Sequence, residues 1–344
     1  MIEHAKLREF FTDKNIMVTG GLGSIGSAII DGLLSFDVRS IKVIDNRETE
    51  LFYASKKSTD KRLKFHFADI RDKSSLRNII KGTNIVFHAA AMKHVIICEK
   101  NPDEAIKTNV LGTQNIIELC TESNVDKMIL ISTDKAVTPE GVMGTTKLLA
   151  EKMISAMHNV NEHNKTKFGA VRFGNVLYSR GSVLEIWAEQ LEKQGKITIT
   201  NYDMTRFFMG IPQSVELILM AAYYINNAEI FIMKMPSCSI RDLSTAFLEA
   251  RQRTDCQCEI IGINKGDKMH EKLLSEDENA DILENEKFLI KLPLELSTYK
   301  TAFDYSELGF KKSNIQNFSS NNSAYLMDKD ELKTIIEKYV TTEL

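Results

Sequence analysis

The 344-residue sequence predicts an α/β protein built on a doubly wound parallel sheet, with a second, smaller lobe of mixed α and β structure. Two observations support this fold class. Between Asn15 and about Asn175, short apolar runs alternate with longer segments of helical periodicity, which is typical of a parallel sheet covered by helices on both faces. The first apolar run also breaks into glycines and resumes as an amphipathic segment, which predicts a strand, a tight turn and a helix.

That first segment reads Asn15-Ile-Met-Val-Thr-Gly-Gly-Leu-Gly-Ser-Ile-Gly26. Its spaced glycines allow a sharp turn, a close approach of a ligand to the backbone and tight packing of the helix on the strand. The helix N-terminus offers unpaired N–H groups to a pyrophosphate. We therefore predict a Rossmann-type dinucleotide site, the alternative being a glycine-rich turn in some other α/β protein. The predicted contacts in this turn are Gly20, Gly23, Ser24, Ile25 and Gly26.

The choice of cofactor depends on the end of the next predicted strand, Ser40-Ile-Lys-Val-Ile-Asp45. Asp45 follows the last glycine by about 20 residues, the spacing at which a carboxylate meets an adenosine ribose. A carboxylate there accepts hydrogen bonds from the ribose hydroxyls and repels a 2′-phosphate, so we predict NAD rather than NADP. Arg47 favours the opposite choice unless Asp45 or Glu48 pairs with it. Asp69 follows the third strand, where it either contacts the adenine or caps the next helix.

The remaining elements follow from the same patterns. In the first half we expect strands at 16–19, 41–44, 64–68, 85–89, 128–132 and 168–173, and a helix at 102–122. In the second half we expect a loop at 200–207, helices at 213–224, 239–251 and 328–339, strands at 229–233 and 259–263, and a helix beginning within 266–274. The domain prediction is a dinucleotide-binding domain at 13–175 with a return segment near 207–235, a substrate lobe at 176–206 and 236–300, and a C-terminal extension at 301–344.

The bulk composition excludes several classes of protein. A net charge of -3 gives no general attraction to nucleic acid or to an anionic membrane, and no run approaches the roughly 18 to 20 apolar residues of a membrane span. Five scattered cysteines do not form a secreted disulfide framework. We therefore expect a cytoplasmic protein without membrane insertion or nucleic-acid binding. Neither Cys256 with Cys258 nor His270 with Glu271 provides enough ligands for a metal site, so none is predicted.

The most informative cluster is Ser132-Thr-Asp-Lys135, followed by Met143-Gly-Thr-Thr-Lys147. The first stretch stands where a predicted strand ends, and the second continues into a helix start, with Lys147 one turn after Met143 on the same helical face. A carboxyl and an amine at a strand end are suited to acid–base chemistry when their environments tune them. The alternative for Asp134 and Lys135 is a solvated ion pair on a loop.

Motifs spread over most of the chain identify a resemblance. They lie at 19–26, 88–95, 109–113, 132–135, 172–176, 179–183, 203–207 and 266–271. With these motifs the chain resembles the extended short-chain dehydrogenase/reductase superfamily. Within it, the chain is similar to the polysaccharide-biosynthesis (CapD-like) group of nucleotide-sugar 4,6-dehydratases that act on UDP-N-acetylglucosamine. The resemblance also suggests a homo-oligomer, a dimer or a hexamer.

The resemblance implies an internal redox cycle. The sugar C4 is oxidised by hydride transfer, water is eliminated across C5 and C6, and the hydride returns to C6. On this basis Lys135 removes the C5 proton, Asp134 protonates the leaving C6 hydroxyl, and Thr133 hydrogen-bonds the sugar near C4. Lys147 binds the nicotinamide ribose. Met143 stands where the superfamily usually has tyrosine, which leaves the C4 base open among Asp134, Thr133 and a water held by Lys147.

The resemblance also implies further contacts. For the cofactor they add Ile70, Ala89 and Ala90 to the residues already named. For the substrate they are Lys93, Asn175, Arg180, Thr200, Arg206, Lys265 and Asp267. Arg206 is expected to hold the diphosphate with a bidentate fork. Asn264 and Asp267 stand where the group more often has Arg and Glu, which weakens the expected contacts there.

Together these observations predict an NAD-dependent UDP-N-acetylglucosamine 4,6-dehydratase that retains the C5 configuration. Three alternatives stay open: dehydration with C5 epimerisation, a nucleotide-sugar 4-epimerase, and a catalytically silent NAD-binding regulatory protein. The last is motivated by Met143.

Overall fold

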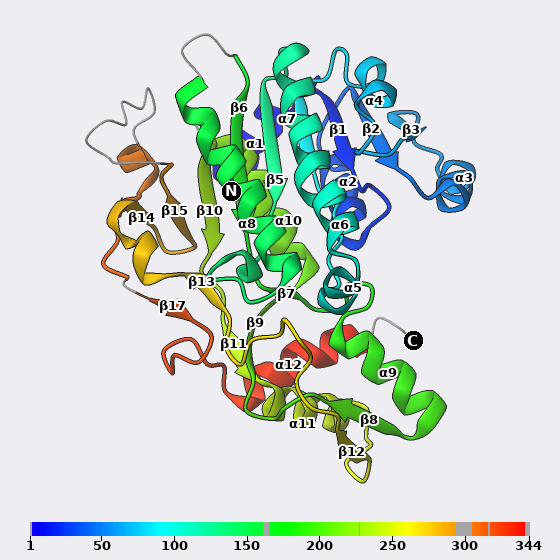
Figure 1. Cartoon of the computed structure of the whole chain (residues 1–344), viewed down its shortest axis with the longest axis vertical. Coiled ribbons are helices and arrows are strands. Elements are labelled where there is room, and N and C mark those ends of the chain that lie inside the picture. The colour runs from blue at the N-terminus through cyan, green and yellow to red at the C-terminus, as the bar shows by residue number, and fades with distance from the viewer. Residues whose placement is uncertain (1, 161–164, 227, 294–304, 316, 341–344) are drawn as a thin grey trace.

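The computed structural model describes residues 2–160, 165–226, 228–293, 305–315 and 317–340. Parts of the predicted substrate lobe (294–300) and of the predicted C-terminal extension (301–304 and 341–344) lie outside these residues. Figure 1 shows a larger lobe built on one extended sheet and a smaller lobe at the ends of its strands.

Seven parallel strands form the centre of the large sheet, in the order β3-β2-β1-β4-β5-β6-β10. Their bounds are Asn15–Thr19 (β1), Ser40–Asp45 (β2), Leu63–Phe67 (β3), Ile85–His88 (β4), Lys127–Ile131 (β5), Lys167–Arg172 (β6) and Glu229–Met233 (β10). The central strands are apolar because both faces are covered; all four residues of β4 are buried. The strand order reverses between β1 and β4, so a ligand crevice opens at their carboxyl ends. The predicted Rossmann-type doubly wound sheet is confirmed.

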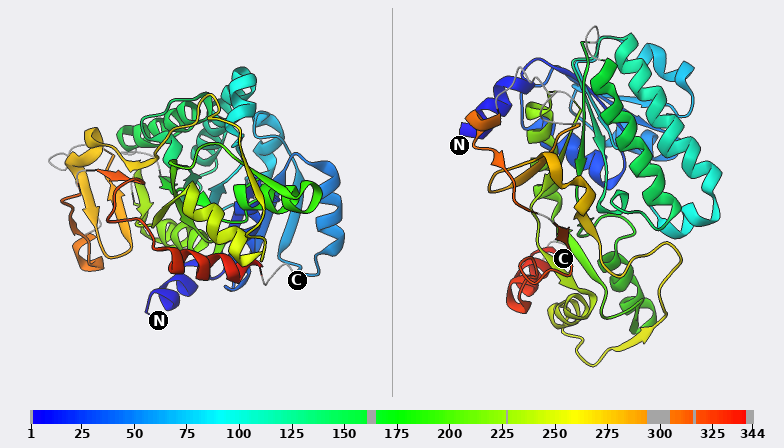
Figure 2. Two further views of the ribbon diagram at one scale, coloured as in Figure 1. Left: turned by 90° about the horizontal axis from the view of Figure 1, so that it is seen from below. Right: turned by 60° about the vertical axis from the view of Figure 1, so that its left-hand side comes forward.

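Helices cover both faces of this sheet, as the right-hand view of Figure 2 shows. One face carries α2 (Ser24–Leu34) and α10 (Ile211–Tyr224), which pack on each other, and the other carries α7 (Gly112–Glu122) and α8 (Val142–Ala156). The other helices of this lobe are α1 (Ile2–Phe11), α3 (Glu48–Lys57), α4 (Lys73–Ile79), α5 (Val95–Lys100) and α6 (Pro102–Ala105).

The predicted helix at 102–122 is continuous but not uniform. Its middle, Ile106–Leu111, is a π-helical turn between α6 and α7. The wider turn buries Asn109, whose side-chain amide donates to Thr146 on α8 and to the carbonyl of Met92. Such turns are frequent at functional sites because they redirect one side chain out of the helical register. Here the redirected side chain fixes α8 against the loop after β4.

The smaller lobe contains short sheets and three helices. Its strands are β11 (Ser237–Ser239), β9 (Thr205–Met209) and β7 (Asn175–Val176) in one sheet, β8 (Lys196–Ile199) with β12 (Gln257–Ile260), and β13 (Lys272–Leu274) with β17 (Phe318–Ser319). Its helices are α9 (Val183–Gln194), α11 (Ile240–Ala250) and α12 (Lys329–Val340). Trp187, Phe247 and Ile336 bring these helices to one apolar core, so the C-terminal helix packs into this lobe (Figure 1).

Three sequence predictions need correction. Residues 266–274 do not begin a helix; they form a loop that ends in β13. The predicted loop at 200–207 ends in strand β9, where Arg206 pairs with Cys238. Segments assigned to the substrate lobe and extension instead widen the large sheet: β14 (Ile282–Glu284), β15 (Phe288–Lys291) and β16 (Lys311–Lys312) run antiparallel beyond β10. The edge of β10 would otherwise leave a row of unpaired backbone groups.

The return of 229–233 to the sheet is confirmed, since β10 pairs with β6. In the described part of the chain, no helix combines the length and the apolar character needed to cross a bilayer. All five cysteines are free thiols.

Candidate functional site

The glycine turn lies between β1 and α2 and approaches the loop after β4 closely. Gly20 has a φ of +63°, and a Cβ there would lie 2.7 Å from the Cα of Ala90. A Cβ on Gly26 would lie 2.1 Å from the carbonyl oxygen of Gly20. Helix α2 begins at Ser24 with Gly23 as its cap and no side chain on its first amides. These features fit a dinucleotide pyrophosphate, which needs close backbone approach and free N–H groups.

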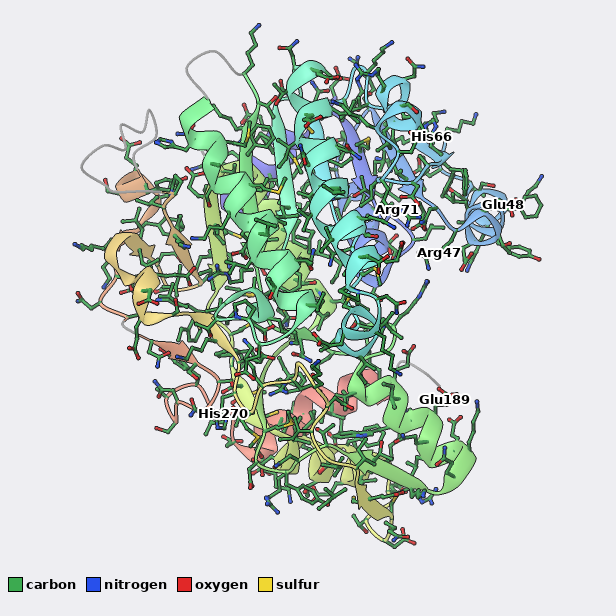
Figure 3. All side chains as sticks on the ribbon, in the orientation of Figure 1. Arg47, Glu48, His66, Arg71, Glu189 and His270 are labelled. Atoms are coloured by element: carbon green, nitrogen blue, oxygen red, sulfur yellow. The ribbon has the colours of Figure 1, made fainter. Side chains whose placement is uncertain are left out.

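Asp45 ends β2 beside this turn and is 6% exposed. Its Oδ2 accepts the amide of Leu22 at 3.1 Å, and Arg47 donates Nε to Oδ1 at 2.9 Å and Nη2 to Oδ2 at 3.0 Å. Burial alone would raise the pKa of Asp45, but Arg47 and the Leu22 amide outweigh burial and lower it. The expected pairing of Arg47 with Asp45 is confirmed, and Figure 3 shows Arg47 on this side of the sheet.

Asp69 follows β3 and does not cap α4; Asp72 does, accepting the amides of Ser74 and Ser75. The helix-cap alternative for Asp69 is therefore wrong. Asp69 instead pairs with Arg71 and accepts a hydrogen bond from Asn46 at 3.3 Å.

The other predicted cofactor residues lie in the loops after β3 and after β4. Ile70 is buried and faces Gly112, where a Cβ would meet its Cδ1 at 2.6 Å. Ala89 and Ala90 form the wall against Gly20, held by amide donation to the carbonyl and hydroxyl oxygens of Thr19.

Asp134 and Lys135 begin a short 3₁₀ turn, Asp134–Ala136, which follows β5 and is capped by Thr133. The hydroxyl of Thr133 donates to Asp134 Oδ1 at 2.9 Å, and Lys135 Nζ donates to the same oxygen at 3.1 Å and to Asn175 Oδ1 at 3.3 Å. Asp134 is fully buried, and its Oδ2 has no hydrogen-bond partner among the described residues. The structure thus brings four predicted residues together and leaves one carboxyl oxygen of Asp134 open to a further donor or acceptor.

Glu271 belongs to this cluster although the sequence did not assign it a chemical role. Its Oε1 lies 3.5 Å from Lys135 Nζ and 4.0 Å from Arg206 Nε, and its Oε2 lies 3.0 Å from Lys268 Nζ. The two carboxylates and three cations come from the turn after β5, from β9 and from the loop before β13. The motif 266–271 signalled that this loop matters, but no local spacing indicated that it reaches Lys135.

The charges of the cluster shift the pKa values of its members. Burial raises the pKa of Asp134, and Glu271 adds to that rise, against the lowering effect of Lys135. Burial alone would lower the pKa of Lys135, but Asp134 and Glu271 outweigh it and raise it. Burial would likewise raise the pKa of Glu271, but its three cations lower it to about 2. Asp134 is therefore the carboxyl of the pair that is disposed to hold a proton.

Arg206 is turned toward protein groups. Its Nη1 donates to the carbonyls of Thr205 and Met269, and its Nη2 donates to the carbonyl of Lys268 at 2.8 Å. Its Nη2 also lies 3.9 Å from Met204 Sδ, which Thr200 contacts through its hydroxyl at 3.2 Å. Diphosphate binding by Arg206 stays a prediction that requires this guanidinium to exchange carbonyls for phosphate oxygens.

Lys147 and Met143 lie on α8 on the other side of the turn. Lys147 Nζ donates to the carbonyl of Ile131 at 2.8 Å. Burial lowers the pKa of Lys147 to about 8, although Glu151 acts to raise it. The side chain of Met143 packs in a small apolar cluster with Cys98 and Ala105. Met143 therefore presents no proton-transferring group at the position where tyrosine is usual.

A loop from the smaller lobe closes over the glycine turn. We call residues 177–182, between β7 and α9, the crossing loop. The amide of Arg180 donates to Ser24 Oγ at 2.9 Å, and Lys93 donates to the carbonyl of Arg180. A Cβ on Gly181, which has a φ of +67°, would lie 2.7 Å from the ring of His94. Lys93 and Arg180 are thus brought together over the predicted cofactor loop.

The remaining predicted substrate residues lie farther out. Lys265 is exposed, and Asp267 accepts a hydrogen bond from Asn264 at 3.1 Å. No contact within the described ranges joins either residue to Lys135. His270, labelled in Figure 3, lies at the junction of the lobes and contacts the hydroxyl of Thr205 at 2.9 Å. In the described part of the chain, no group of three or more His, Cys, Asp or Glu side chains is arranged to hold a metal ion.

A buried charge network lies behind the turn that follows β5. Arg172 at the end of β6 is fully buried and donates Nη2 to Glu151 on α8 at 2.6 Å and Nη1 to Glu278 at 3.0 Å. Lys291 on β15 also donates to Glu278 at 2.6 Å. The network therefore fixes α8, which carries Lys147, to β6 and to the added edge of the sheet.

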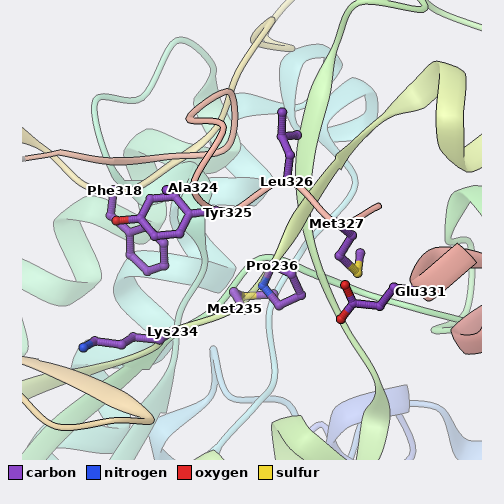
Figure 4. Close-up of a pocket in the computed structure, with 9 residues that line it drawn as sticks. All are labelled: Lys234, Met235, Pro236, Phe318, Ala324, Tyr325, Leu326, Met327 and Glu331. Atoms are coloured by element: carbon purple, nitrogen blue, oxygen red, sulfur yellow. The ribbon is translucent and has the colours of Figure 1, made fainter. Parts of the chain in front are cut away.

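A separate cavity of about 280 Å³ lies at the β10–β11 junction (Figure 4). Its lining residues are Lys234, Met235, Pro236, Phe318, Ala324, Tyr325, Leu326, Met327 and Glu331. None of the predicted site residues lines it.

A glycine turn at the switch point of a Rossmann-type sheet, with a Thr-Asp-Lys turn under a second lobe, is the architecture of an extended short-chain dehydrogenase/reductase. The model of the polysaccharide biosynthesis protein family matches residues 16–292. The chain belongs to this family, and the resemblance inferred from its motifs is confirmed.

Several relatives match nearly the whole chain, including the following three. An uncharacterized membrane protein of Methanocaldococcus jannaschii is 41% identical over 338 residues, 96% of this chain and 98% of the relative. A Campylobacter jejuni protein named UDP-N-acetylglucosamine 4,6-dehydratase (inverting) is 35% identical over 332 residues, 95% and 98% of the two chains. A Rickettsia bellii protein named UDP-glucose 4-epimerase is also 35% identical, over 344 residues, 97% and 99% of the two chains.

Solved structures share the fold. The X-ray structure of Pen from Bacillus thuringiensis has a TM-score of 0.90 and 33% identity, covering 96% of this chain and 99% of that one. A dTDP-glucose 4,6-dehydratase from Streptomyces venezuelae, solved with NAD bound, has a TM-score of 0.69 and 20% identity, covering 74% and 86% of the two chains. The second likeness is one of fold.

Proposed function

We propose that this chain is an NAD-dependent UDP-N-acetylglucosamine 4,6-dehydratase, a hydro-lyase that forms a 4-keto-6-deoxy sugar with the C5 configuration retained. The observation that supports dehydration best is the pair Asp134–Lys135. A buried carboxyl with an unpartnered oxygen and a raised pKa lies 3.1 Å from an amine on the same turn. Elimination of water needs an acid and a base on neighbouring carbons, whereas a 4-epimerase needs neither at C5 and C6.

The proton path follows the contacts of the turn. When bound, NAD supplies reversible hydride acceptance, which oxidises C4 and later reduces C6. Thr133 relays the C4 hydroxyl proton to Asp134, to which it is hydrogen-bonded at 2.9 Å. Lys135 in its neutral amine form takes the C5 proton, and Asp134 gives its proton to the departing C6 hydroxyl, which leaves as water. Lys135 returns its proton to C5, so both residues end in their starting states.

Lys147 and Asn175 orient the reactants in this proposal. Lys147 projects from α8 and donates to the carbonyl of Ile131 at the end of β5, which supports its proposed role as a donor to the nicotinamide ribose. The side-chain oxygen of Asn175 accepts a hydrogen bond from Lys135 Nζ at 3.3 Å and so orients this side chain. Arg206 is proposed to turn to the diphosphate, and Lys93, Arg180 and Thr200 to line the path of the nucleotide.

The preference for NAD rests on Asp45, whose carboxylate is kept ionised and whose guanidinium partner is already engaged. We expect Asp45→Asn to weaken NAD binding about 10-fold while improving NADP binding, because the repulsion of a 2′-phosphate is removed. Titration of both cofactors by calorimetry tests this preference. Arg47→Leu is the matched control, and it should bind NADP more weakly than the wild type does. An Asp45→Asn variant that keeps the wild-type ratio of the two dissociation constants contradicts the proposed role.

The decisive experiment is incubation of the protein with UDP-N-acetylglucosamine in heavy water, followed by mass and proton NMR spectra of the product. A loss of one water with deuterium at C5 supports the dehydratase, and the ring coupling constants report retention or inversion. Lys135→Met should abolish the exchange at C5. An unchanged sugar in the presence of bound NAD would refute this substrate assignment.

Two enzymatic alternatives have specific support. The C. jejuni relative is named for the inverting reaction, so dehydration with C5 epimerisation predicts the same mass loss with an altered ring. The R. bellii relative is named UDP-glucose 4-epimerase, and that activity predicts a change of C4 configuration without loss of water. The silent NAD-binding protein predicts cofactor binding, no turnover and no effect of Lys135→Met. The NMR experiment distinguishes all four.

A further inference from the structure

Glu271 lies inside the cluster that the proposed dehydration uses, yet that mechanism gives it no task. It is 1% exposed and reaches Lys135 from the loop before β13. Its backbone amide donates to Ser320 Oγ at 2.9 Å, and this hydrogen bond fixes the loop. A buried carboxylate is retained only at a cost in desolvation, which its neighbours must offset.

The surroundings of Glu271 show what offsets that cost. One carboxylate oxygen faces Lys135 at 3.5 Å and Arg206 at 4.0 Å, and the other faces Lys268 at 3.0 Å. Lys268 is itself buried and donates to the carbonyl of Val137 at 2.9 Å. Glu271 is therefore the one described carboxylate that balances charge on all three of these cations.

Lys135 has two carboxylate neighbours that differ in kind. Asp134 contacts it at 3.1 Å but has an unpartnered oxygen and, in the proposed reaction, alternates between protonated and ionised forms. Glu271 differs because a cation faces each of its oxygens: Lys135 Nζ lies 3.5 Å from Oε1 and Lys268 Nζ lies 3.0 Å from Oε2, although Oε2 makes no hydrogen bond to the described residues. When Asp134 is protonated, Glu271 is the remaining counter-charge for the Lys135 ammonium.

We propose that Glu271 is a positioning residue for the dehydration: it orients Lys135 beside Asp134 and stabilises the positive charge that Lys135 gains when it takes the C5 proton. Lys268 limits this effect by sharing the same carboxylate. The other charged or titratable groups that face Lys135 are Asp134 from its own turn and Arg206 from β9. The inference rests on the proposed function for the role of Lys135, but the pairing itself can be measured without turnover.

The first test is a direct titration of Lys135. The protein with lysine labelled with ¹³C at the ε carbon is followed by NMR across pH, and the Lys135 signal is identified by its loss in Lys135→Met. Glu271→Gln, which keeps the shape, should lower the pKa of Lys135 by about 1 to 3 pH units. Lys268→Met should raise it, because the carboxylate is then less neutralised. An unchanged pKa in Glu271→Gln, or a fall in Lys268→Met, overturns the proposal.

The second test is kinetic. In Glu271→Gln, kcat should fall about 10- to 100-fold while KM changes little, and the rising limb of the kcat/KM profile should move to lower pH. Glu271→Asp keeps the charge and should restore the limb toward the wild-type pH. A purely structural role predicts lower activity with no movement of that limb.

Two further observations keep the outcomes separate. Glu278→Gln removes another buried carboxylate, one that pairs with Arg172 and not with Lys135, and it should leave the Lys135 titration unchanged. If the wild-type protein dehydrates no UDP-sugar, the proposed function fails while the titration still decides whether Glu271 sets the charge of Lys135. If dehydration proceeds but Glu271→Gln changes neither the pKa of Lys135 nor the rising limb of the kcat/KM profile, the inference fails while the proposed function stands.

Discussion

At the scale of single residues, Lys147 is a buried cation whose positive charge destabilises the folded state. Burial lowers its pKa from 10.5 to about 8, so between these values the unfolded chain binds more protons than the folded one. The stability of the fold therefore rises with pH through this window. The pKa falls by about 2.5 units, and each unit corresponds to about 1.36 kcal/mol of free energy. The destabilisation by Lys147 is therefore at most roughly 3 kcal/mol.

We predict that Lys147→Met is more stable than the wild type at pH 7 and that the advantage disappears toward pH 10.5. Urea unfolding of both proteins across this range measures the difference, which cancels the titration of other groups. Activity should be lost, because the proposed contact of Lys147 with the nicotinamide ribose is removed. A variant less stable than the wild type at pH 7 contradicts the prediction.

At this scale, the sequence predicted the positions of residues where the pattern is local. Gly20, Asp45 and Asp134 were predicted from spacing within a strand and the turn that follows it, and the structure brings them to the carboxyl ends of β1, β2 and β5. The contact of Glu271 with Lys135 was not predicted, because only the tertiary fold brings these two residues together. The cap role allowed for Asp69 belongs to Asp72, and this competition between nearby acids has no sequence signal.

At the scale of elements, the Arg172 network fastens β6, α8 and the added edge strands together. Glu151 is 1% exposed and supplies both of its oxygens to Arg172. Removal of one partner leaves a buried guanidinium only partly compensated, so Glu151→Ala should cost about 3–5 kcal/mol of unfolding free energy. Chemical denaturation measures the loss.

The control for this prediction is a surface pair. Glu118→Ala breaks the partly exposed contact between Glu118 and Lys73 and leaves Lys73 paired with Glu122. Its cost should stay below about 1 kcal/mol. If the two variants lose similar amounts of unfolding free energy, the buried network stabilises the fold no more than a surface pair does.

Elements were predictable where periodicity dominates and not where packing decides. The helix at 102–122 was expected, but its π-helical middle was not, because the turn is stabilised by Asn109 reaching Thr146 on another helix. The segment at 266–274 has helical composition, yet its Lys268 and Glu271 are drawn into the charge cluster and its end pairs with β17.

At the scale of the whole molecule, the crossing loop joins the two lobes over the glycine turn. Gly181 permits this closure because any side chain there meets His94. We predict that Gly181→Ala releases bound dinucleotide at least several-fold faster than the wild type, measured by stopped-flow displacement. Gly195→Ala is a matched control: Gly195 has a similar φ of +66°, but nothing lies within 4 Å of the added methyl.

Both variants carry the same backbone strain, so they should lose similar amounts of stability, about 1 kcal/mol. Only the Gly181 variant should open the loop. Equal release rates in the two variants would assign the closure to other contacts, such as Lys93 with Arg180.

The lobes themselves were predicted from the change in pattern near Asn175, but the assignment of 282–291 was wrong. The apolar run Phe288-Leu-Ile supplies a strand for whichever sheet has an open edge, and β10 has one. Sequence alone does not say which edge is open. The oligomeric state stays a prediction.

The crossing loop has a consequence for how long the protein would keep its cofactor bound. In the proposed reaction the dinucleotide finishes in the state in which it began, so it has no reason to exchange between turnovers. A loop tied down through Ser24 and Lys93 would then make it a resident part rather than a consumed reagent. The rate of sugar conversion would be independent of the cell's balance of oxidised and reduced nicotinamide, and would follow the supply of the nucleotide sugar alone.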